Sequence, residues 1–196
     1  MAKKPIKLQK NALSGSQKDL SVRKKGSSLK GKKIALAIAG GIGATEAVKI
    51  AREIRRQGGS VKAFMSPQAR RFITPLSVEW ATLQKPVLRA GPQVEYLEAF
   101  DVVLVTPATL HTLSKSALAL SDNVVDLVIA NQLGSKGKVM MVLAMNSQLW
   151  THPLVETYQK TLESWGVRFF PGEEEEDRLK VPEAKALVEW LIGQMK

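Results

Sequence analysis

Four apolar runs in the sequence each end at a short segment that could contact a ligand. These segments are residues 40–42 (Gly-Gly-Ile), Ser66, residues 107–109 (Pro-Ala-Thr) and residues 144–146 (Ala-Met-Asn). Most of them carry small or hydrogen-bonding groups, and none carries a positive side chain. This pattern suits a phosphate held by backbone N–H groups and neighbouring hydroxyls. The alternative is that the Gly-Gly pair only forms a tight turn between a strand and a helix, and the motif by itself leaves both interpretations open.

The residues around these segments favour a mononucleotide as the phosphate-bearing ligand. The stretch "GIGATE" (41–46) begins like a dinucleotide fingerprint but places Glu46 where that fingerprint needs a small residue. The second apolar run ends at Phe64-Met65-Ser66, without the acid that would bind a ribose hydroxyl. The Gly-Lys-Ser/Thr ending of a P-loop is also missing from the sequence. A mononucleotide with one phosphate remains, and FMN is the commonest large one.

Alternating strands and helices must position these segments. Apolar runs predict strands over residues 33–39, 60–65, 101–107, 138–144 and 166–170. Helical periodicity predicts helices over 42–57, 67–72, 75–83, 109–133, 153–165 and 182–195, with Asp122 as the cap of a second segment within 109–133. This order predicts an α/β fold, a Rossmann-like doubly wound parallel sheet with helices on both faces. Ligands of such sheets bind beyond the carboxyl ends of the strands.

The net charge of +11 is concentrated at the N-terminus. Residues 1–33 hold 11 Lys/Arg and one acid, whereas the rest of the chain holds 18 Lys/Arg and 17 acids. We therefore predict a basic, disordered tail over residues 1–31 and a folded domain over 32–196. The tail could be an arm that binds nucleic acid or another polyanion. We favour a merely solvated tail, because it lacks an aromatic residue that could stack on a base. The acidic run 173–177 is expected to be a solvated loop.

The cysteine and histidine content excludes several kinds of site. The sequence contains no cysteine and only two histidines, His111 and His152. Disulfides, Cys-ligated zinc, iron–sulfur clusters and a thiol nucleophile within the chain are thereby excluded, and a His-rich metal site is disfavoured. No apolar run reaches the roughly 18 residues of a membrane-spanning helix, and no apolar segment of a signal peptide follows the basic N-terminus. We expect a cytoplasmic protein with no bound metal.

Three longer stretches carry a resemblance to a known family. They are "AIAGGIGATEAVKIAREIRRQGGSVKAFMSPQARRFITPLSVEW", "DVVLVTPATLHTLSKSALALSDNVVD" and "VLAMNSQLWTHPLVETYQKTLESWGV". Together they resemble the FMN-dependent cysteine decarboxylases, over roughly residues 32–183. The ordered motifs "PAT…T…K…D" and "AMN…W…P" are the specific part of the match. The resemblance implies a Rossmann-like fold, bound FMN, a small-molecule substrate, and trimers or multiples of trimers with FMN near the subunit interface.

The resemblance also implies roles for individual residues. The residues that match FMN contacts of the family are Gly40, Gly41, Ile42, Ser66, Pro67, Gln68, Thr109, Leu110, His111, Thr112 and Ala144. Asn146 matches the asparagine that grips the carboxylate of the substrate cysteine. In that family the flavin oxidises the thiol to a thioaldehyde, and the carboxylate leaves as carbon dioxide.

The sequence departs from the family at two catalytic positions. Gln93 stands eight residues before Asp101, where the decarboxylases carry a histidine, and glutamine is neither an acid nor a base near neutral pH. The segment that follows the last strand, "PGEEEEDRLKVPE", lacks the cysteine of the family's flap. His111 replaces the usual asparagine of the Pro-Ala-Thr loop. It is either a neutral change beside the flavin or a relocated acid/base.

Three functions remain open from the sequence. The first, which we favour, is an FMN-binding flavoprotein that uses its flavin for redox chemistry or electron transfer rather than standard cysteine decarboxylation. The second is a true phosphopantothenoylcysteine decarboxylase of coenzyme A synthesis. The third is a non-enzymatic, FMN-bearing regulatory subunit whose basic tail docks an acidic partner.

Overall fold

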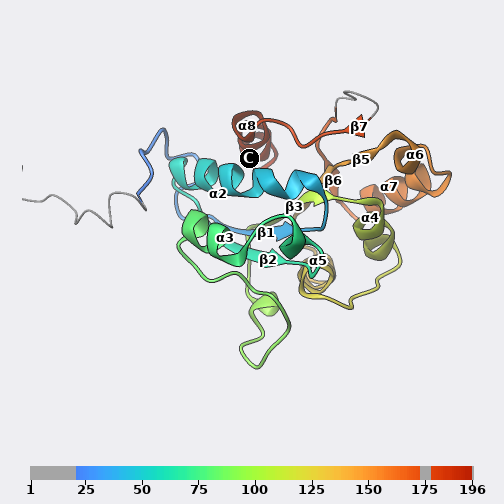
Figure 1. Cartoon of the computed structure of the whole chain (residues 1–196), viewed down its shortest axis with the longest axis horizontal. Coiled ribbons are helices and arrows are strands. Elements are labelled where there is room, and N and C mark those ends of the chain that lie inside the picture. Colours follow the sequence, from blue (N-terminus) through green and yellow to red (C-terminus); the bar gives the residue numbers. More distant parts are fainter. Residues whose placement is uncertain (1–20, 173–177, 196) are drawn as a thin grey trace, which may run out of the picture.

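Five parallel strands form the central sheet, in the order β2-β1-β3-β4-β6 (Figure 1). They are β1 (Lys33–Ile38), β2 (Ser60–Met65), β3 (Val102–Ala108), β4 (Val139–Leu143) and β6 (Arg168–Phe169). The computed structural model describes residues 21–172 and 178–195. The order reverses between β1 and β3, and the sheet is parallel throughout. The prediction of an α/β fold with a parallel sheet is thus confirmed.

Helices cover both faces of this sheet. On one face lie α2 (Ala47–Arg56) and α8 (Ala184–Met195), with α3 (Pro75–Thr82) beside α2. On the other lie α4 (Leu110–Ala117), α5 (Val124–Gly134) and α7 (Leu154–Ser164). Strand β1 shows why both layers are needed. Ile34, Leu36 and Ile38 enter the first core, while Ala35 and Ala37 enter the second, because successive side chains of a strand point to opposite faces.

Several helices differ in detail from the sequence prediction. The helix expected over 42–57 begins as a 3-10 turn, η1 (Ile42–Glu46), and becomes α-helical only at Ala47. The helix expected over 67–72 is the short 3-10 turn η2 (Ala69–Arg71), and another, η3 (Glu95–Leu97), precedes β3. The segment 109–133 divides into α4 and α5, as expected. However, Asn123 rather than Asp122 caps α5, since its Oδ1 accepts from the N–H groups of Val125 (2.9 Å) and Asp126 (3.4 Å).

A second, two-stranded sheet was not predicted from the sequence. Strand β5 (Met145–Asn146) pairs antiparallel with β7 (Arg178–Leu179), and a one-turn helix, α6 (Ser147–Trp150), follows β5. The chain therefore leaves the central sheet after β4, contacts the segment that precedes α8, and then enters the helical layer. The acidic run 173–177, expected to be a solvated loop, lies outside the described residues.

The N-terminal segment also differs from the expectation of a free tail. Residues 1–20 lie outside the described part of the chain, but residues 21–31 pack against the C-terminal end of α2. The backbone N–H groups of Lys25 and Leu29 donate to the carbonyls of Arg56 and Gln57, both at 2.9 Å. Leu29 is only 1% exposed and belongs to the core between α2 and the sheet. The folded domain therefore begins before residue 32.

Within the described residues, no helix is both long enough and apolar enough to span a membrane.

Candidate functional site

A hollow of ≈ 380 Å³ lies at the carboxyl edge of the sheet. It is bounded by the ends of β1 and β2, by the start of α4, and by the loop that joins α4 to α5. The lining residues are Ala39, Gly40, Ser66, Pro67, Gln68, Thr109, His111, Thr112, Lys115, Asp122, Asn123, Val125 and Asp126. This is the crevice in which open α/β sheets bind ligands. We call it the carboxyl-edge hollow.

Two of its walls are held together by a contact that tolerates no side chain. A Cβ built on Gly40 would lie 2.2 Å from the Cβ of Gln68 and 3.0 Å from its carbonyl carbon. The turn after β1 and the loop after β2 can approach this closely only because residue 40 is glycine. At Gly41, by contrast, a Cβ would lie 3.5 Å from the nearest atom, Cγ2 of Thr109, and the backbone is extended (φ −177°). The crowded glycine of the pair is therefore Gly40.

Hydroxyl groups fix the two neighbouring loops. Ser66 Oγ accepts from the N–H of Ala69 at 3.1 Å, which closes the turn after β2. Thr109 caps α4: its Oγ1 accepts from the N–H of Thr112 at 3.4 Å and lies 3.3 Å from Thr112 Oγ1. The first N–H groups of a helix have no acceptor within the helix itself. The hydroxyl-bearing residues Ser66, Thr109 and Thr112 thus line one hollow at the start of α4, and helix starts are common anion-binding positions.

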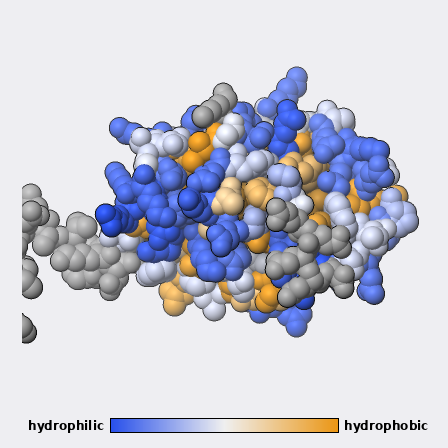
Figure 2. All heavy atoms as spheres, turned by 90° about the horizontal axis from the view of Figure 1, so that it is seen from above, coloured by the Kyte–Doolittle hydropathy of each residue, from blue (hydrophilic) through white to orange (hydrophobic). Residues whose placement is uncertain are grey.

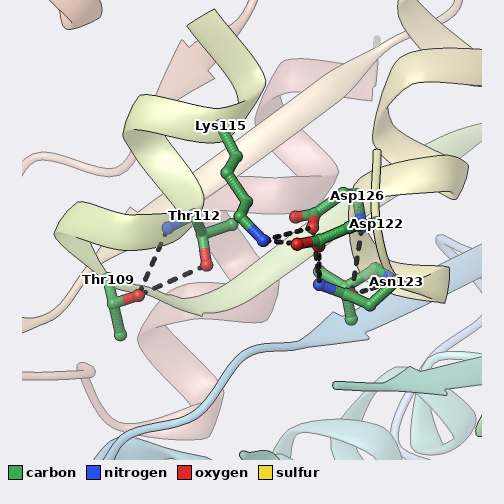
Figure 3. A network of polar contacts seen from close by, with 7 residues as sticks. Thr109, Thr112, Lys115, Asp122, Asn123 and Asp126 are labelled. Atoms are coloured by element: carbon green, nitrogen blue, oxygen red, sulfur yellow. Dashed lines mark hydrogen bonds and ion pairs between the residues drawn. The ribbon is translucent and has the colours of Figure 1, made fainter. Parts of the chain in front are cut away.

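A charged network forms the opposite wall (Figure 3). Lys115 of α4 forms a close ion pair with Asp122 and lies 3.5 Å from Asp126 Oδ2 on α5. Asn123 donates from Nδ2 to Asp126 Oδ2 at 2.5 Å and to Asp122 Oδ1 at 3.1 Å. The side chains of Lys115 and Asp126 are 11% and 2% exposed, whereas that of Asp122 is 67% exposed. The buried Lys115 is therefore neutralised by the buried Asp126 and by the solvent-facing Asp122.

Burial separates the pKa values of the two carboxyls. Burial, together with the hydrogen bond to the Asp122 carboxyl, raises the pKa of Asp126 to about 6. The positive charge of Lys115 lowers this pKa but does not outweigh the other two effects. The contact with Lys115 lowers the pKa of Asp122 to about 2. Burial disfavours the charged form of Lys115, but its hydrogen bond to Asp122 and the charges of both acids outweigh that penalty and raise its pKa. The wall thus carries one cation, one anion and one acid that titrates near pH 6.

The structure brings most of the predicted cofactor residues together. Those that line the hollow are Gly40, Ser66, Pro67, Gln68, Thr109, His111 and Thr112. Pro67, Gln68 and His111 are exposed, whereas Ser66 and Thr112 are buried. Residues far apart in the sequence thus surround one space, which is the arrangement that the resemblance implied.

Four other predicted cofactor residues lie beside this hollow without lining it. Gly41 follows Gly40 in the turn, and Ile42 is 68% exposed at the start of η1. Leu110 packs against the core that underlies α4. Ala144 lies at the end of β4, where its N–H donates to the carbonyl of Ala108 at 3.0 Å. This bond places Ala144 next to Thr109 in space.

The side chain of Asn146 caps a helix. Its Oδ1 accepts from the N–H of Leu149 at 2.9 Å and so caps α6. It is exposed and pairs with Arg178 in the two-stranded sheet, and it is not among the residues that line the hollow. Of these two predicted catalytic residues, His111 lines the hollow and Asn146 does not.

Sequence reasoning missed four residues of the charged wall. Lys115, Asn123, Val125 and Asp126 line the hollow, and Asp122 does so in place of the capping role expected of it. The sequence did contain a signal for this network, because Lys115 and Asp126 each lie among apolar residues of a predicted helix. Charged residues at such positions are buried only when they are paired. The sequence does not show which acid meets the lysine, because the partners lie on two different helices.

Comparison with known proteins identifies the family of the chain. The family model described as Flavoprotein matches residues 22–196. The coenzyme A biosynthesis bifunctional protein CoaBC of Thermococcus kodakarensis is 36% identical over 174 residues, which make up 85% of this chain and 43% of that protein. The chain thus spans less than half the length of this relative.

Two solved structures show the same fold. The FMN-dependent cysteine decarboxylase SpaF superposes with a TM-score of 0.73 at 20% identity, covering 85% of this chain and 98% of that chain. The FMN binding protein AtHal3 superposes with a TM-score of 0.69 at 18% identity, covering 82% of this chain and 94% of that chain. From the profile match over nearly the whole described chain, the protein belongs to the flavoprotein family.

Proposed function

We propose that the chain binds FMN in the carboxyl-edge hollow. The observation that carries this proposal is the meeting of three loops of a flavoprotein-family chain around one hollow of ≈ 380 Å³. This volume lies within the range of small-molecule sites, roughly 300–1,000 Å³. The hydroxyls of Ser66, Thr109 and Thr112 and the N–H groups at the start of α4 would hold the phosphate.

The donor set fits an anionic cofactor. The two acids that face the hollow are already compensated by Lys115 and by hydrogen bonds from Asn123. They therefore place little free negative charge against a phosphate. Val125, Ala39 and Pro67 supply apolar surface for a flat ring. Backbone and hydroxyl donors, rather than lysine or arginine, would then give the phosphate its contacts.

Titration of the purified chain with FMN and with riboflavin tests this proposal. We expect saturable quenching of flavin fluorescence and a dissociation constant at least tenfold lower for FMN, because riboflavin lacks the phosphate. NAD serves as the control ligand and should not compete. A protein that takes up neither flavin, or that binds NAD in preference, would show that the proposal is wrong.

We further propose that bound FMN serves redox chemistry or electron transfer rather than standard cysteine decarboxylation. When bound, FMN supplies reversible acceptance of electrons. Gln93, at the position of the family's histidine, lies in an exposed turn and is not part of the hollow. His111, at the start of α4, lines the hollow, and its imidazole would contact the bound cofactor or the substrate there. Asn146 would contribute to substrate binding only if its cap on α6 opened or its free amide group were used.

Phosphopantothenoylcysteine decarboxylation is the second candidate. The 36% identity to a CoaBC protein favours it, although the chain matches only 43% of that protein. Incubation of the FMN-loaded chain with phosphopantothenoylcysteine decides between the candidates, by mass spectrometry of the product. Loss of carbon dioxide from the substrate at a catalytic rate would establish the second candidate, whereas recovery of the unchanged substrate would support the first.

A homo-oligomer, a trimer or a multiple of three, is also proposed. Large apolar side chains on and near α3 are exposed, with Leu76 at 74%, Leu83 at 50% and Phe72 at 44%. The loop that carries Gln93 also exposes Leu97, at 53%. Large apolar side chains exposed in such numbers are candidates for an interface between subunits. Light scattering on the purified protein measures the mass directly, and a monomer at micromolar concentration would contradict the proposal.

A further inference from the structure

The charged wall of the carboxyl-edge hollow contains two acids but only one lysine. Lys115 forms a close ion pair with Asp122 and lies 3.5 Å from Asp126 Oδ2. The side-chain amide of Asn123 donates to both carboxyls, at 3.1 Å to Asp122 and 2.5 Å to Asp126, and so holds them next to each other. All four residues line the hollow. If both carboxyls were ionised, two anions would therefore face one cation, and the wall would keep a surplus negative charge.

Asp126 is the acid that can remove this surplus by holding a proton. Its side chain is 2% exposed, whereas that of Asp122 is 67% exposed, so water stabilises the charge of Asp122 far better than that of Asp126. Burial, and then the hydrogen bond to the Asp122 carboxyl, raises the pKa of Asp126 to about 6. Near neutral pH, the wall therefore exists in two forms, one balanced in charge and one with a surplus negative charge.

Lys115 is the one lysine or arginine at this wall of the described chain. His111 of α4 and Asp122 of the loop between α4 and α5 are the other titratable residues that share the hollow with Asp126. Strands β1 to β4 and the turn η3 also pack against α5. None of the titratable residues of these elements lines the hollow, namely Lys33, Lys62, Glu95 and Tyr96. Protonation of Asp126 is thus the available way to balance the wall, because Asp122 already engages the lysine.

We propose that Asp126 is a specificity-determining residue, which lets the carboxyl-edge hollow accept a phosphate-bearing ligand when its carboxyl is protonated and disfavours that ligand when it is ionised. This inference rests on the proposed binding of FMN in the same hollow. A phosphate monoester carries a charge of about −1.5 to −2 near pH 7. Like charges in one hollow repel each other, so FMN would bind with uptake of a proton from solvent onto Asp126. Riboflavin, which has no phosphate, would bind without this uptake.

Fluorescence titration with FMN and with riboflavin, from pH 5 to pH 8, tests the proposal on the original chain and on Asp126→Asn. If bound FMN raises the pKa of Asp126 by about one unit, the variant should bind FMN about tenfold more tightly than the original chain at pH 8 and equally at pH 5. Ionisation of the FMN phosphate itself is common to both chains and cancels in this ratio. The affinities for riboflavin should differ by less than twofold at every pH.

Calorimetry of FMN binding in buffers of different ionisation enthalpy counts the protons directly. For the same rise in pKa, the original chain should take up about 0.4 proton more per FMN at pH 7 than Asp126→Asn does. Asp122→Asn removes the other carboxyl and leaves Lys115 and Asp126 as a balanced pair, so it should abolish this excess as well. Two variants in different elements thus test the proposal independently, and urea unfolding verifies that each is folded.

Glu189→Gln is the control for the loss of one negative charge. Glu189 is exposed on α8, on the opposite face of the sheet, and lies 3.8 Å from Lys185. Helix α8 is on the side of the molecule that Figure 2 shows, where many hydrophilic residues are exposed. This variant should keep the proton uptake of the original chain and change the affinity for FMN by less than twofold.

Two results would overturn the proposal while FMN binding itself stands. An affinity for FMN that depends on pH in the same way in the original chain and in Asp126→Asn would show that this carboxyl does not act on the phosphate. Equal changes for FMN and riboflavin would show that the residue acts through packing rather than through charge. If the original chain bound no flavin at all, the proposed function would fail, and this inference would fail with it.

Discussion

Cationic side chains have different surroundings at the two edges of the sheet. At the carboxyl edge, the buried Lys115 pairs with the buried Asp126 and with the exposed Asp122. At the amino edge, where β1 and β2 begin, Lys24, Lys30 and Arg55 line a hollow of ≈ 490 Å³ that no described acidic side chain lines. The first edge would hold an anion through neutral donors, whereas the second edge carries cationic side chains. Charge placement, rather than total charge, therefore separates the two surfaces.

The largest effect on stability is expected from Lys115→Met, which keeps most of the side-chain volume but removes the cation. The buried Asp126 would then lose its counter-charge, and breaking a buried pair in this way costs about 3–5 kcal/mol. The loss should be greater at pH 8 than at pH 5, because the carboxyl can take up a proton at the lower pH. Urea unfolding at both pH values measures it.

Lys160→Met is the matched control for this change. Lys160 pairs with Glu156 at 2.5 Å, but both side chains are more than 70% exposed. Such exposed pairs are screened by solvent and contribute little to stability, so the loss should be far smaller than in Lys115→Met. Equal losses in the two variants would mean that the carboxyl-edge network is no more than a surface ion pair.

Gly40→Ala should have the next largest effect. The new Cβ would overlap the Cβ of Gln68, so one of the two loops must move, at a cost of about 1–3 kcal/mol in unfolding free energy. Flavin affinity should fall with it. Gly41→Ala is the control and should keep both properties, because its Cβ would make only an ordinary contact with Thr109. If Gly41→Ala proved the more harmful, the contact between the loops would not be what requires glycine.

Asp126→Asn tests the proton held at the carboxyl edge. The pKa of Asp126 is raised from 3.8 to about 6 in the folded chain, so its contribution to stability is greatest below pH 4 and is lost as pH rises through 6. The asparagine variant should therefore gain about 1–2 kcal/mol relative to the original chain between pH 4 and pH 7. Parallel urea unfolding curves at four pH values measure this difference. A constant difference would show that Asp126 is ionised throughout.

The smallest effect on stability is expected from His111→Gln. His111 is exposed at the start of α4, so the unfolding free energy should change by less than about 0.5 kcal/mol. His111 also lines the carboxyl-edge hollow, so the rate of flavin reduction should fall in this variant if the imidazole contacts the reacting groups. An unchanged rate would show that His111 takes no part in the reaction.

The central sheet was predictable because its strands are buried on both faces. In β1, Ile34, Leu36 and Ile38 serve one core and the alanines between them serve the other, so the run is apolar throughout. The loops that follow such strands could be located from the strand ends alone. That is why Gly40, Ser66 and Thr109 could be placed at one edge before their contacts were known.

The remaining features depend on contacts that leave no local pattern. Strands β5 and β7 are two residues each and pair across a long separation in sequence. Asp122 and Asn123 are both good capping residues, and only the geometry of the loop selects Asn123. The Lys115–Asp126 contact joins two helices, and helical spacing within either one does not predict it.

Leu29 determines where the chain can be shortened without damage. It is a single apolar residue in a basic stretch, and its side chain fills the core beneath α2. A truncation that starts at residue 32 would remove this side chain along with the lysines, so lost charge and lost packing could not be told apart. Removal of residues 1–20 takes away five lysines and leaves six Lys/Arg of the first 33 residues in place. A cut after residue 20 therefore removes five lysines and keeps Leu29 in the core, so that the effect of charge can be measured apart from the effect of packing.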